Sequence, residues 1–404
     1  MVPKGWEKNS LDSLFEFKNG LNTEKEQYGN GYKFVNVMDV FRNDILTESK
    51  IIGRVQVTDK QLEGYQLKYG DVLFNRTSET FDEIAIAAIY LDNAIATFGG
   101  FVIRARPKGN QIDPGYSVFL FQSKSYRSQV VKLGQGAIRA NIGQKDLARV
   151  CILVPPLAEQ KKIAQILSTW DKAISVTEKL LTNSQQQKKA LMQQLLTGNK
   201  RLLDENGGRF IGEWCTCTLS EVAHIIMGSS PKSEAYNDNG LGLPLIQGNA
   251  DIKCRVSCPR VYTSDITKEC SPGDILLSVR APVGTVALSQ HKACIGRGIS
   301  AIKSKRKMSQ SFLYQWFLWF EPKWCYLSQG STFESINSDD IKTLKLSVPN
   351  FEEQQKIATV LSAADDEIAT LEKKLACLKD EKKALMQQLL TGKRRVKIDE
   401  AVAA

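Results

Sequence analysis

The stretch KKALMQQLLTG occurs twice in this chain, at residues 188–198 and again at 382–392. The similarity extends beyond the two copies, because residues 154–198 align with 348–392 at a fixed shift of 194 positions, without a gap. The alignment holds 25 identities in 45 positions. A repeat of this length predicts one structural module written twice, and it decides how the rest of the chain is interpreted.

The composition is that of a folded, basic protein. The chain has 404 residues, a formal net charge of +10 and 42% hydrophobic residues, which suits two to four domains with cores. The charge favours a polyanionic partner, nucleic acid ahead of membrane, although a merely basic protein has the same balance. No signal peptide is apparent, and no apolar window approaches the ~18 residues of a membrane span. We therefore expect a cytoplasmic protein without a membrane segment.

Nine cysteines without a secretory signal indicate reduced thiols. Cys215-x-Cys217 together with Cys254-x3-Cys258 leaves a zinc site as an alternative, but neither spacing is the usual Cys-x2-Cys. We expect small buried thiols and no metal.

The repeat divides the chain into four segments. A β-rich module at 1–153 precedes a helix at 154–200, and a second β-rich module at 208–347 precedes a helix at 348–395. Short β-type runs broken by turn signals, such as Val72–Phe74, fill both modules. The modules align less closely than the helices, so they share a scaffold with different loops, where binding specificity usually varies. The predicted fold class is α+β.

Each helix begins at a Val-Pro pair and ends at a glycine. Apolar residues recur at spacings of three and four, as in a coiled-coil seam, with interruptions at Thr177, Ser184 and Lys382. Chain order then predicts an antiparallel pair roughly 60 Å long that holds the modules apart like a ruler, with a pseudo-two-fold axis. The alternative is two helices packed separately on their own modules. The predicted seam residues are Ile163, Leu167, Ile174, Leu181, Ile357, Leu361, Ile368, Leu371, Leu375 and Leu378.

The sequence carries no recognisable catalytic centre. It has no Gly-x4-Gly-Lys-Ser/Thr loop, no Gly-x-Gly-x-x-Gly after a strand, and no Asn/Asp-Pro-Pro-aromatic tetrapeptide of the kind that amino-methyltransferases use. Only two histidines are present, which leaves little material for a triad or a metal centre. We therefore expect a non-catalytic protein.

Polar loops on both modules carry side chains suited to DNA. Arg and Asn make paired hydrogen bonds to base edges in the major groove, while Lys, Ser and Thr mostly contact phosphates. In each module, one loop with such residues follows the strand that begins after a Gly-Asp pair, Gly70-Asp71 or Gly273-Asp274. A second loop follows a Gln-Gly pair, Gln135-Gly136 or Gln329-Gly330. The candidate DNA-binding residues are Arg76, Thr77, Ser78, Arg139, Asn141, Arg280 and Thr332.

The double pattern resembles the specificity subunit of type I restriction–modification enzymes. It consists of a β-rich module, then Val-Pro-Pro-Leu-Ala-Glu-Gln-Lys-Lys-Ile-Ala, then Leu-Leu-Thr-Gly, and the second copy departs from the first run at four positions, Asn350 and Phe351 among them. The resemblance covers essentially the entire chain. It implies that the modules are target recognition domains, that the helices are spacers, and that the subunit is not catalytic. It also implies two modification subunits that methylate adenine with S-adenosylmethionine, and restriction/translocase subunits that need ATP and Mg²⁺.

We therefore expect sequence-specific binding of a split, asymmetric duplex DNA target, with one half-site per module. Identity on every face of the helix ends also predicts a surface for two copies of one partner, unless the duplication is recent. The alternatives are a coiled-coil scaffold joining two protein-binding domains, and a self-sufficient methyltransferase or nuclease, which the missing motifs disfavour. The candidate partner-binding residues are Leu191, Leu195, Leu385 and Leu389.

Overall fold

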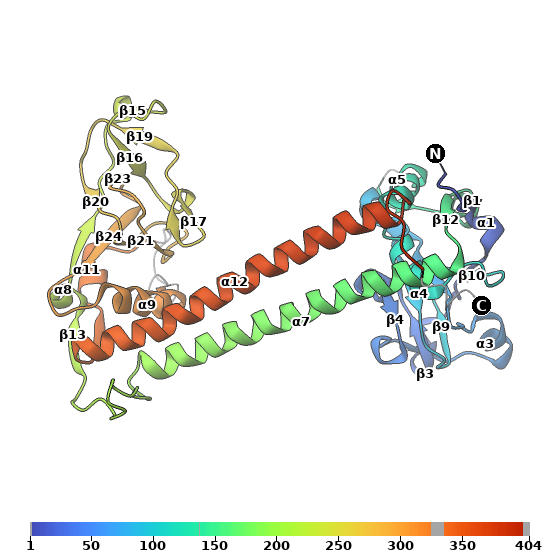
Figure 1. The fold of residues 1–404 in the computed structure, drawn as a ribbon, viewed down its shortest axis with the longest axis horizontal. Coiled ribbons are helices and arrows are strands. Elements are labelled where there is room, and N and C mark those ends of the chain that lie inside the picture. The colour runs from blue at the N-terminus through green and yellow to red at the C-terminus, as the bar shows by residue number, and fades with distance from the viewer. Residues whose placement is uncertain (1, 137, 325–334, 399–404) are drawn as a thin grey trace. The chain divides into compact units, whose positions relative to one another are not determined.

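The computed structural model describes residues 2–136, 138–324 and 335–398 (Figure 1). It consists of two compact units. The first unit comprises residues 1–178 and 374–404, and the second comprises 179–373. Each unit therefore contains one β-rich module, the start of the long helix that follows it, and the end of the other long helix.

The first module is built on a five-stranded sheet of order β2-β10-β6-β8-β4 and a three-stranded sheet of order β5-β3-β9. Two small pairs, β1-β12 and β11-β7, complete it. Its strands are β1 Glu7–Ser10, β2 Phe15–Asn19, β3 Tyr28–Val35, β4 Ile45–Leu46, β5 Arg54–Val55, β6 Val72–Asn75, β7 Thr77–Ser78, β8 Ala87–Tyr90, β9 Ala96–Phe98, β10 Val102–Pro107, β11 Ala140–Asn141 and β12 Cys151–Val154. Its helices are α1 Leu11–Leu14, α2 Val37–Arg42, α3 Asp59–Tyr65, α4 Pro114–Leu120, α5 Lys124–Leu133 and α6 Gln144–Ala148.

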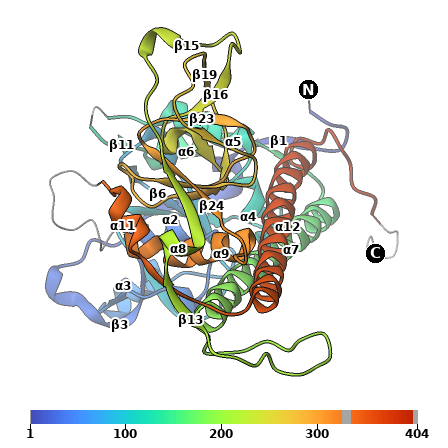
Figure 2. The same ribbon diagram turned by 90° about the vertical axis from the view of Figure 1, so that its left-hand side faces the viewer.

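The second module repeats this plan with a longer excursion. Its six-stranded sheet has the order β14-β24-β21-β22-β18-β17, and the five-stranded sheet β15-β19-β16-β23-β20 extends away from α9 (Figure 2). Its strands are β13 Cys215–Thr218, β14 Ala223–Met227, β15 Tyr236–Asn237, β16 Leu243–Ile246, β17 Ile252–Lys253, β18 Val256–Ser257, β19 Val261–Thr263, β20 Glu269–Cys270, β21 Ile275–Ser278, β22 Val286–Leu288, β23 Ala293–Ile295, β24 Ile299–Ser304 and β25 Lys345–Val348. Its helices are α8 Leu219–Val222, α9 Gln310–Phe320 and α11 Ser338–Lys342.

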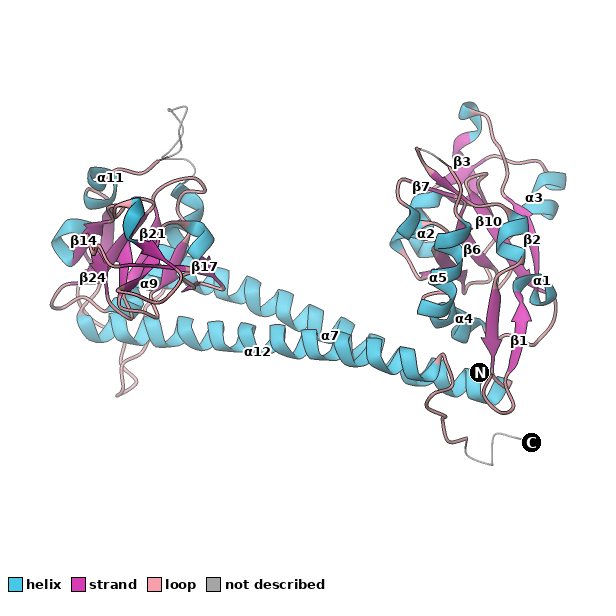
Figure 3. Cartoon of the chain, turned by 90° about the horizontal axis from the view of Figure 1, so that it is seen from above, coloured by secondary structure: helices cyan, strands magenta, loops and turns pink. Residues whose placement is uncertain are grey.

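The two long helices, α7 Leu157–Leu195 and α12 Phe351–Leu389, have 39 residues each. The glycines predicted to terminate them, Gly198 and Gly392, have φ of 74° and 68°, a backbone conformation that glycine adopts without strain. In the first unit, α4 lies between the sheet and the long helices (Figure 3). The predicted combination of β-rich modules and long helices is confirmed.

Within each unit the long helices run antiparallel and make equivalent ion pairs. In the first unit Lys382 pairs with Asp171, and in the second Lys188 pairs with Asp365. The shift of 194 residues relates Lys188 to Lys382 and Asp171 to Asp365, so the two pairs are the same contact with the helices exchanged. The alternative of two helices packed separately is therefore wrong.

The helix ends belong to the cores of the units. Ile163 and Leu167 are buried with Leu389 and Leu390 in the core of the first unit. In the second unit Ile357 and Leu361 are buried with Met192, Leu195 and Leu196. The other six predicted seam residues are half-buried: Ile174, Leu181, Ile368, Leu371, Leu375 and Leu378.

Two of the three polar residues that interrupt the seam, Thr177 and Ser184, are buried and hydrogen-bonded. The Thr177 hydroxyl donates to the carbonyl of Ala173 at 2.8 Å, and the Ser184 hydroxyl donates to the Glu367 carboxylate at 3.1 Å. These two hydroxyls are tolerated in the seam because each of them has a hydrogen-bond partner. Among the described helices, none is long and apolar enough to cross a membrane.

Candidate nucleic-acid interface

In the first unit, two loop segments that are far apart in sequence form one hydrogen-bonded pair. β7 pairs with β11 so that Thr77 lies opposite Asn141 and Ser78 opposite Ala140. The N–H of Ile142 donates to the carbonyl of Arg76 at 3.0 Å. The predicted residues Arg76, Thr77 and Asn141 are therefore brought together.

These three residues line a cavity of about 440 Å³. Asn22, Thr23, Asn36 and Phe101 share the lining. Arg76 and Asn141 are exposed, and the Thr23 hydroxyl is buried without a hydrogen-bond partner in the described chain. A cavity with one guanidinium, several amides and an exposed aromatic ring offers hydrogen-bond groups and a stacking surface of the kinds that nucleic acid uses.

The charged groups at this cavity are one guanidinium in the lining and one carboxyl group beside it. Arg76 is the one charged side chain among the described residues that line it. Asp39, next to the lining residue Asn36, accepts the backbone N–H of Asn36 at 2.8 Å, and burial raises the pKa of its carboxyl. The cavity therefore presents a cation and neutral polar groups toward solvent.

Two other predicted residues are placed differently. Arg139 is exposed in the loop before β11, where its carbonyl accepts the Asn141 side-chain amide at 3.0 Å. Ser78 is 6% exposed, and its hydroxyl donates to the Glu83 carboxylate at 3.3 Å. The Ser78 side chain is therefore engaged within its own turn, and its contact with DNA stays a prediction. Thr332 lies outside the described residues.

The second unit repeats the same frame. The N–H of Ile336 donates to the carbonyl of Val279 at 2.9 Å, as Ile142 does to Arg76, and Arg280 forms a bridge with Ser335. Arg280 therefore occupies the place of Thr77, not of Arg76. Two further backbone hydrogen bonds repeat. Gly99 donates to the Val35 carbonyl, and its counterpart Gly296 donates to the Ile246 carbonyl. Leu21 donates to the Phe98 carbonyl, and its counterpart Ser229 donates to the Ile295 carbonyl.

On this common frame the side chains differ at almost every position. Arg297, which is exposed, stands where the first unit has Gly100. A Cβ on Gly100 would lie 2.2 Å from Oδ1 of Asn22, so a side chain there requires a different neighbour. The second unit has that neighbour in the shorter Ser230. At other equivalent positions, the first unit has Asn36, Phe101 and Asn141 where the second unit has Gln247, Gly298 and Ser335.

Sequence reasoning missed Asn22, Thr23, Phe101 and Arg297. Asn22 and Phe101 reach the site because Leu21 bridges to Gly99, which joins segments 78 residues apart. The available signal was glycine. In the first unit Gly20 lies just before Asn22, and Gly99-Gly100 lies just before Phe101. Gly228 and Gly296-Arg297-Gly298 are the counterparts in the second unit. A Cβ on Gly20 would lie 2.0 Å from the Gly99 carbonyl oxygen, so this close approach requires glycine.

No group of three or more His, Cys, Asp or Glu side chains that could hold a metal is found in the described part of the chain. Cys215 and Cys254 are exposed, and Cys270 and Cys294 are buried as free thiols. Burial raises the pKa of the Cys217 and Cys270 thiols.

Residues 3–183 and 211–380 match the family model described as the type I restriction modification DNA specificity domain. The chain belongs to the type I restriction–modification specificity-subunit family. It is 33% identical to a Methanocaldococcus jannaschii protein named as the MjaX type I restriction enzyme specificity subunit, over 98% of this chain and 95% of that one. The HsdS subunit from Thermoanaerobacter tengcongensis is 25% identical with a TM-score of 0.51, covering 97% of this chain and 98% of that one.

A further solved chain, from work on complex assembly and conformational transition of the type I restriction–modification system, has a TM-score of 0.60. It is 25% identical and covers 96% of this chain and 98% of that chain. The two matches to the family domain coincide with the two repeats, so each module with most of its helix is one specificity domain. Membership of this family implies DNA recognition and assembly with other restriction–modification subunits.

The four residues predicted from the sequence to bind partner subunits lie near the ends of the long helices. Leu195 and Leu389 are 0% and 2% exposed and lie in the cores of their units. The chain itself covers these two side chains, and their contact with a partner stays a prediction. Leu191 and Leu385 are half-buried against the same cores, and their contact with a partner stays a prediction.

Proposed function

We propose that this chain binds a split, asymmetric duplex DNA target, with one half-site read by each module. One observation carries the proposal: the two units present different side chains on the same hydrogen-bonded frame. The first unit has Arg76, Thr77 and Asn141 where the second has Val279, Arg280 and Ser335. Two related surfaces with different donors and acceptors would select two different half-sites.

We further propose that the paired helices set the number of unread base pairs between the half-sites. The chain would not catalyse a reaction itself. It would recruit two modification subunits, which use S-adenosylmethionine to methylate adenine, and restriction/translocase subunits that use ATP and Mg²⁺. This assembly would act on DNA in the cytoplasm. The exact repeat of 188–198 at 382–392 supports two binding positions for one kind of partner.

Mapping methylated adenines genome-wide, in a host that expresses this chain with its modification subunit, tests the proposal. The expected target has two different specified segments separated by a fixed run of unspecified bases. A continuous or palindromic target contradicts the assignment of one half-site to each module.

The rival function, a scaffold joining two protein-binding domains, predicts no specific DNA binding. Equilibrium titration of the purified complex with duplex DNA at several salt concentrations separates the two functions. A DNA-binding assembly loses affinity steeply as salt rises, because bound counterions are released from the phosphates.

A further inference from the structure

The two copies of the repeated helix motif meet different surroundings in their units. Helices α4 and α9 are equivalent, because the Gln160 side chain accepts the N–H of Asp113 at 2.8 Å and the Gln354 side chain accepts that of Ser309 at 2.9 Å. Asp113 and Ser309 are the N-caps of α4 and α9. α4 ends after 7 residues, whereas α9 continues for 11.

The additional turn of α9 covers the repeated motif in the second unit. Trp319 donates its indole N–H to the side-chain oxygen of Gln193 at 3.2 Å. The Lys323 ammonium lies 3.5 Å from the centroid of the Trp319 ring, a cation–π contact. Phe320 stacks on the buried Trp316 with ring centroids 5.0 Å apart, so the half-buried rings of Trp319 and Phe320 form an aromatic cover here.

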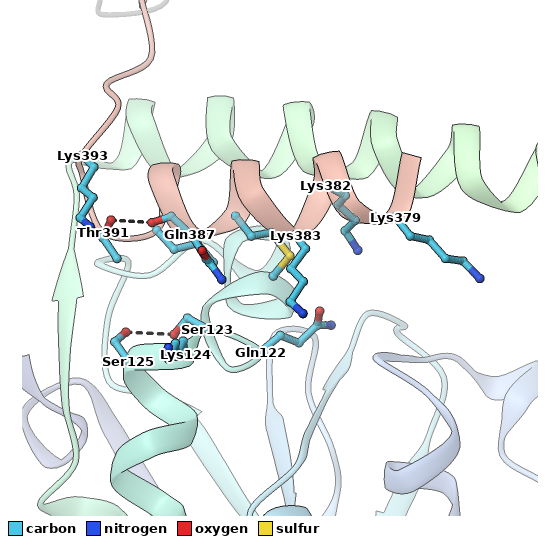
Figure 4. Close-up of a pocket in the computed structure, with 12 residues that line it drawn as sticks. Gln122, Ser123, Lys124, Ser125, Lys379, Lys382, Lys383, Gln387, Thr391 and Lys393 are labelled. Carbon is cyan, nitrogen blue, oxygen red and sulfur yellow. Dashed lines mark hydrogen bonds between the residues drawn. The ribbon is translucent and has the colours of Figure 1, made fainter. Parts of the chain in front are cut away.

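In the first unit the same position is open. α4 ends at Leu120, and the chain turns at Ser123 into α5. A cavity of about 610 Å³ lies between the start of α5 and the end of α12, and we call it the lysine groove (Figure 4). Lys383 points from α12 across the groove toward Gln122. The groove is lined by Lys124, Lys379, Lys382, Lys383 and Lys393, and no carboxylate is among its described lining residues.

Part of this charge is not compensated within the described chain. Lys382 pairs with Asp171, and Lys379 pairs with Glu178 at 2.8 Å. Lys124, Lys383 and Lys393 have no such pair in the part of the chain that the structure describes. Three ammonium groups around one concave surface repel one another. An anionic ligand between them is attracted to all three and offsets that repulsion.

The floor of the groove is apolar. Met386 and Leu390 line it between the lysines, and Gln387 adds an amide. A phosphate backbone would satisfy the ammonium groups and leave these apolar side chains without contacts. A protein segment with carboxylates along one edge and apolar side chains along the other satisfies both.

The second unit does not repeat this chemistry. Lys382, Lys383 and Met386 have identical equivalents there, but Gln185 replaces Lys379 and Asn199 replaces Lys393. Trp319 and Phe320 stand where the first unit has Ser123 and Lys124. The difference comes from the modules and from the residues that flank the motif, since residues 188–198 and 382–392 are identical.

We propose that the lysine groove binds an acidic, partly apolar segment of the modification subunit, and that the second unit lacks this contact. This inference rests on the proposed function, because it assumes that modification subunits bind at the helix ends. Two copies of one partner would then be held with unequal strength, although the helix motif that they meet is repeated exactly in sequence.

The repeat supplies a matched pair of variants. Lys383→Glu reverses a charge in the groove, and Lys189→Glu makes the same change at the equivalent position of the second unit. Both residues are exposed, so both variants are expected to fold, and circular dichroism with thermal melting checks this. Each variant is co-expressed with the modification subunit, and native mass spectrometry measures the number of bound copies over a range of salt concentrations.

We expect Lys383→Glu to weaken one of the two bound copies by about tenfold and to leave a 1:1 complex where the unmodified chain holds two. Lys189→Glu is expected to change the affinity less than about twofold. Equal loss in the two variants, or no loss in either, overturns the proposal. Normal uptake of two copies by Lys383→Glu, together with weaker binding to random duplex DNA, also overturns it and assigns the groove to the DNA backbone. A failure of the unmodified chain to bind any modification subunit contradicts the proposed function itself.

Discussion

Arg395, near the C-terminus, forms two hydrogen bonds with the buried carboxylate of Glu159 at the start of α7, one of them 2.9 Å long. The same carboxylate accepts the indole N–H of Trp6 at 3.2 Å. In the second unit Arg201 binds Glu353 in the equivalent way, with two bonds of 2.6 Å. A single acidic side chain in each unit therefore fixes the start of one helix to the segment that follows the other.

Arg395→Ala is expected to destabilise the first unit by about 1–2 kcal/mol. Removing one partner leaves the 5% exposed Glu159 side chain uncompensated, and the 42% exposure of Arg395 keeps the cost below that of a fully buried pair. Denaturant unfolding measures the change. Arg394→Ala is the control, because Arg394 is an exposed neighbour, and an equal loss in both variants would contradict a specific role for the pair.

Arg280→Ala is expected to weaken DNA binding by about 1–3 kcal/mol and to relax specificity in one half-site only. The reason is that Arg280 is exposed on the frame of the second unit, away from the lining of the first-unit cavity. Arg76→Ala should relax the other half-site. Methylome mapping of both variants checks the assignment, and loss of selectivity in both half-sites from either change would argue for a shared reading surface.

Inserting four residues into each long helix is expected to lengthen the unread gap by about one to two base pairs, since four helical residues span roughly 6 Å. The insertions belong beside Glu178 in α7 and Lys379 in α12, which pair at 2.8 Å, so that both helices lengthen together. Both half-site sequences should stay unchanged in the methylome. An unchanged gap would show that the helices do not set the spacing.

Replacing both Leu371 and Leu375 by asparagine is expected to lower stability by about 1–3 kcal/mol and to weaken binding to the complete target more than to a single half-site. Both side chains are half-buried in the seam, so the cost lies below that of fully buried leucines. Lys374→Asn, at an exposed position, is the matched control. Unchanged melting and binding in the double variant would remove these residues from the seam.

Much of the fold could be predicted because its signals are local or repeated. The run Val72–Phe74 is observed as β6, and the terminating glycines have the expected positive φ. The pattern marks Thr177 and Ser184 as breaks in the seam, because periodicity counts apolar residues only. It cannot show that the Thr177 hydroxyl binds the Ala173 carbonyl of its own helix, or that the Ser184 hydroxyl binds Glu367 on the other helix.

The site was predictable only in part. Arg76, Thr77 and Asn141 were found from loop composition, but their pairing depends on the register of β7 with β11. Arg297 was missed because the glycines on either side of it signal a turn, but not which segment that turn contacts. Leu195 and Leu389 were assigned to a partner because identity on all faces of a helix does not reveal which face the core covers.

The reciprocal contacts of Arg395 with Glu159 and of Arg201 with Glu353 have a consequence for ancestry. A gene encoding only residues 1–213 would still specify both partners, since Glu159 and Arg201 lie in one repeat. Such a chain could complete its contacts by pairing with a second copy of itself. We expect this half-length protein to form a homodimer, detectable by sedimentation, that recognises an inverted repeat of a single half-site. After fusion of two such genes, the two halves can change independently. A protein that recognises a palindromic target then becomes one that recognises an asymmetric target.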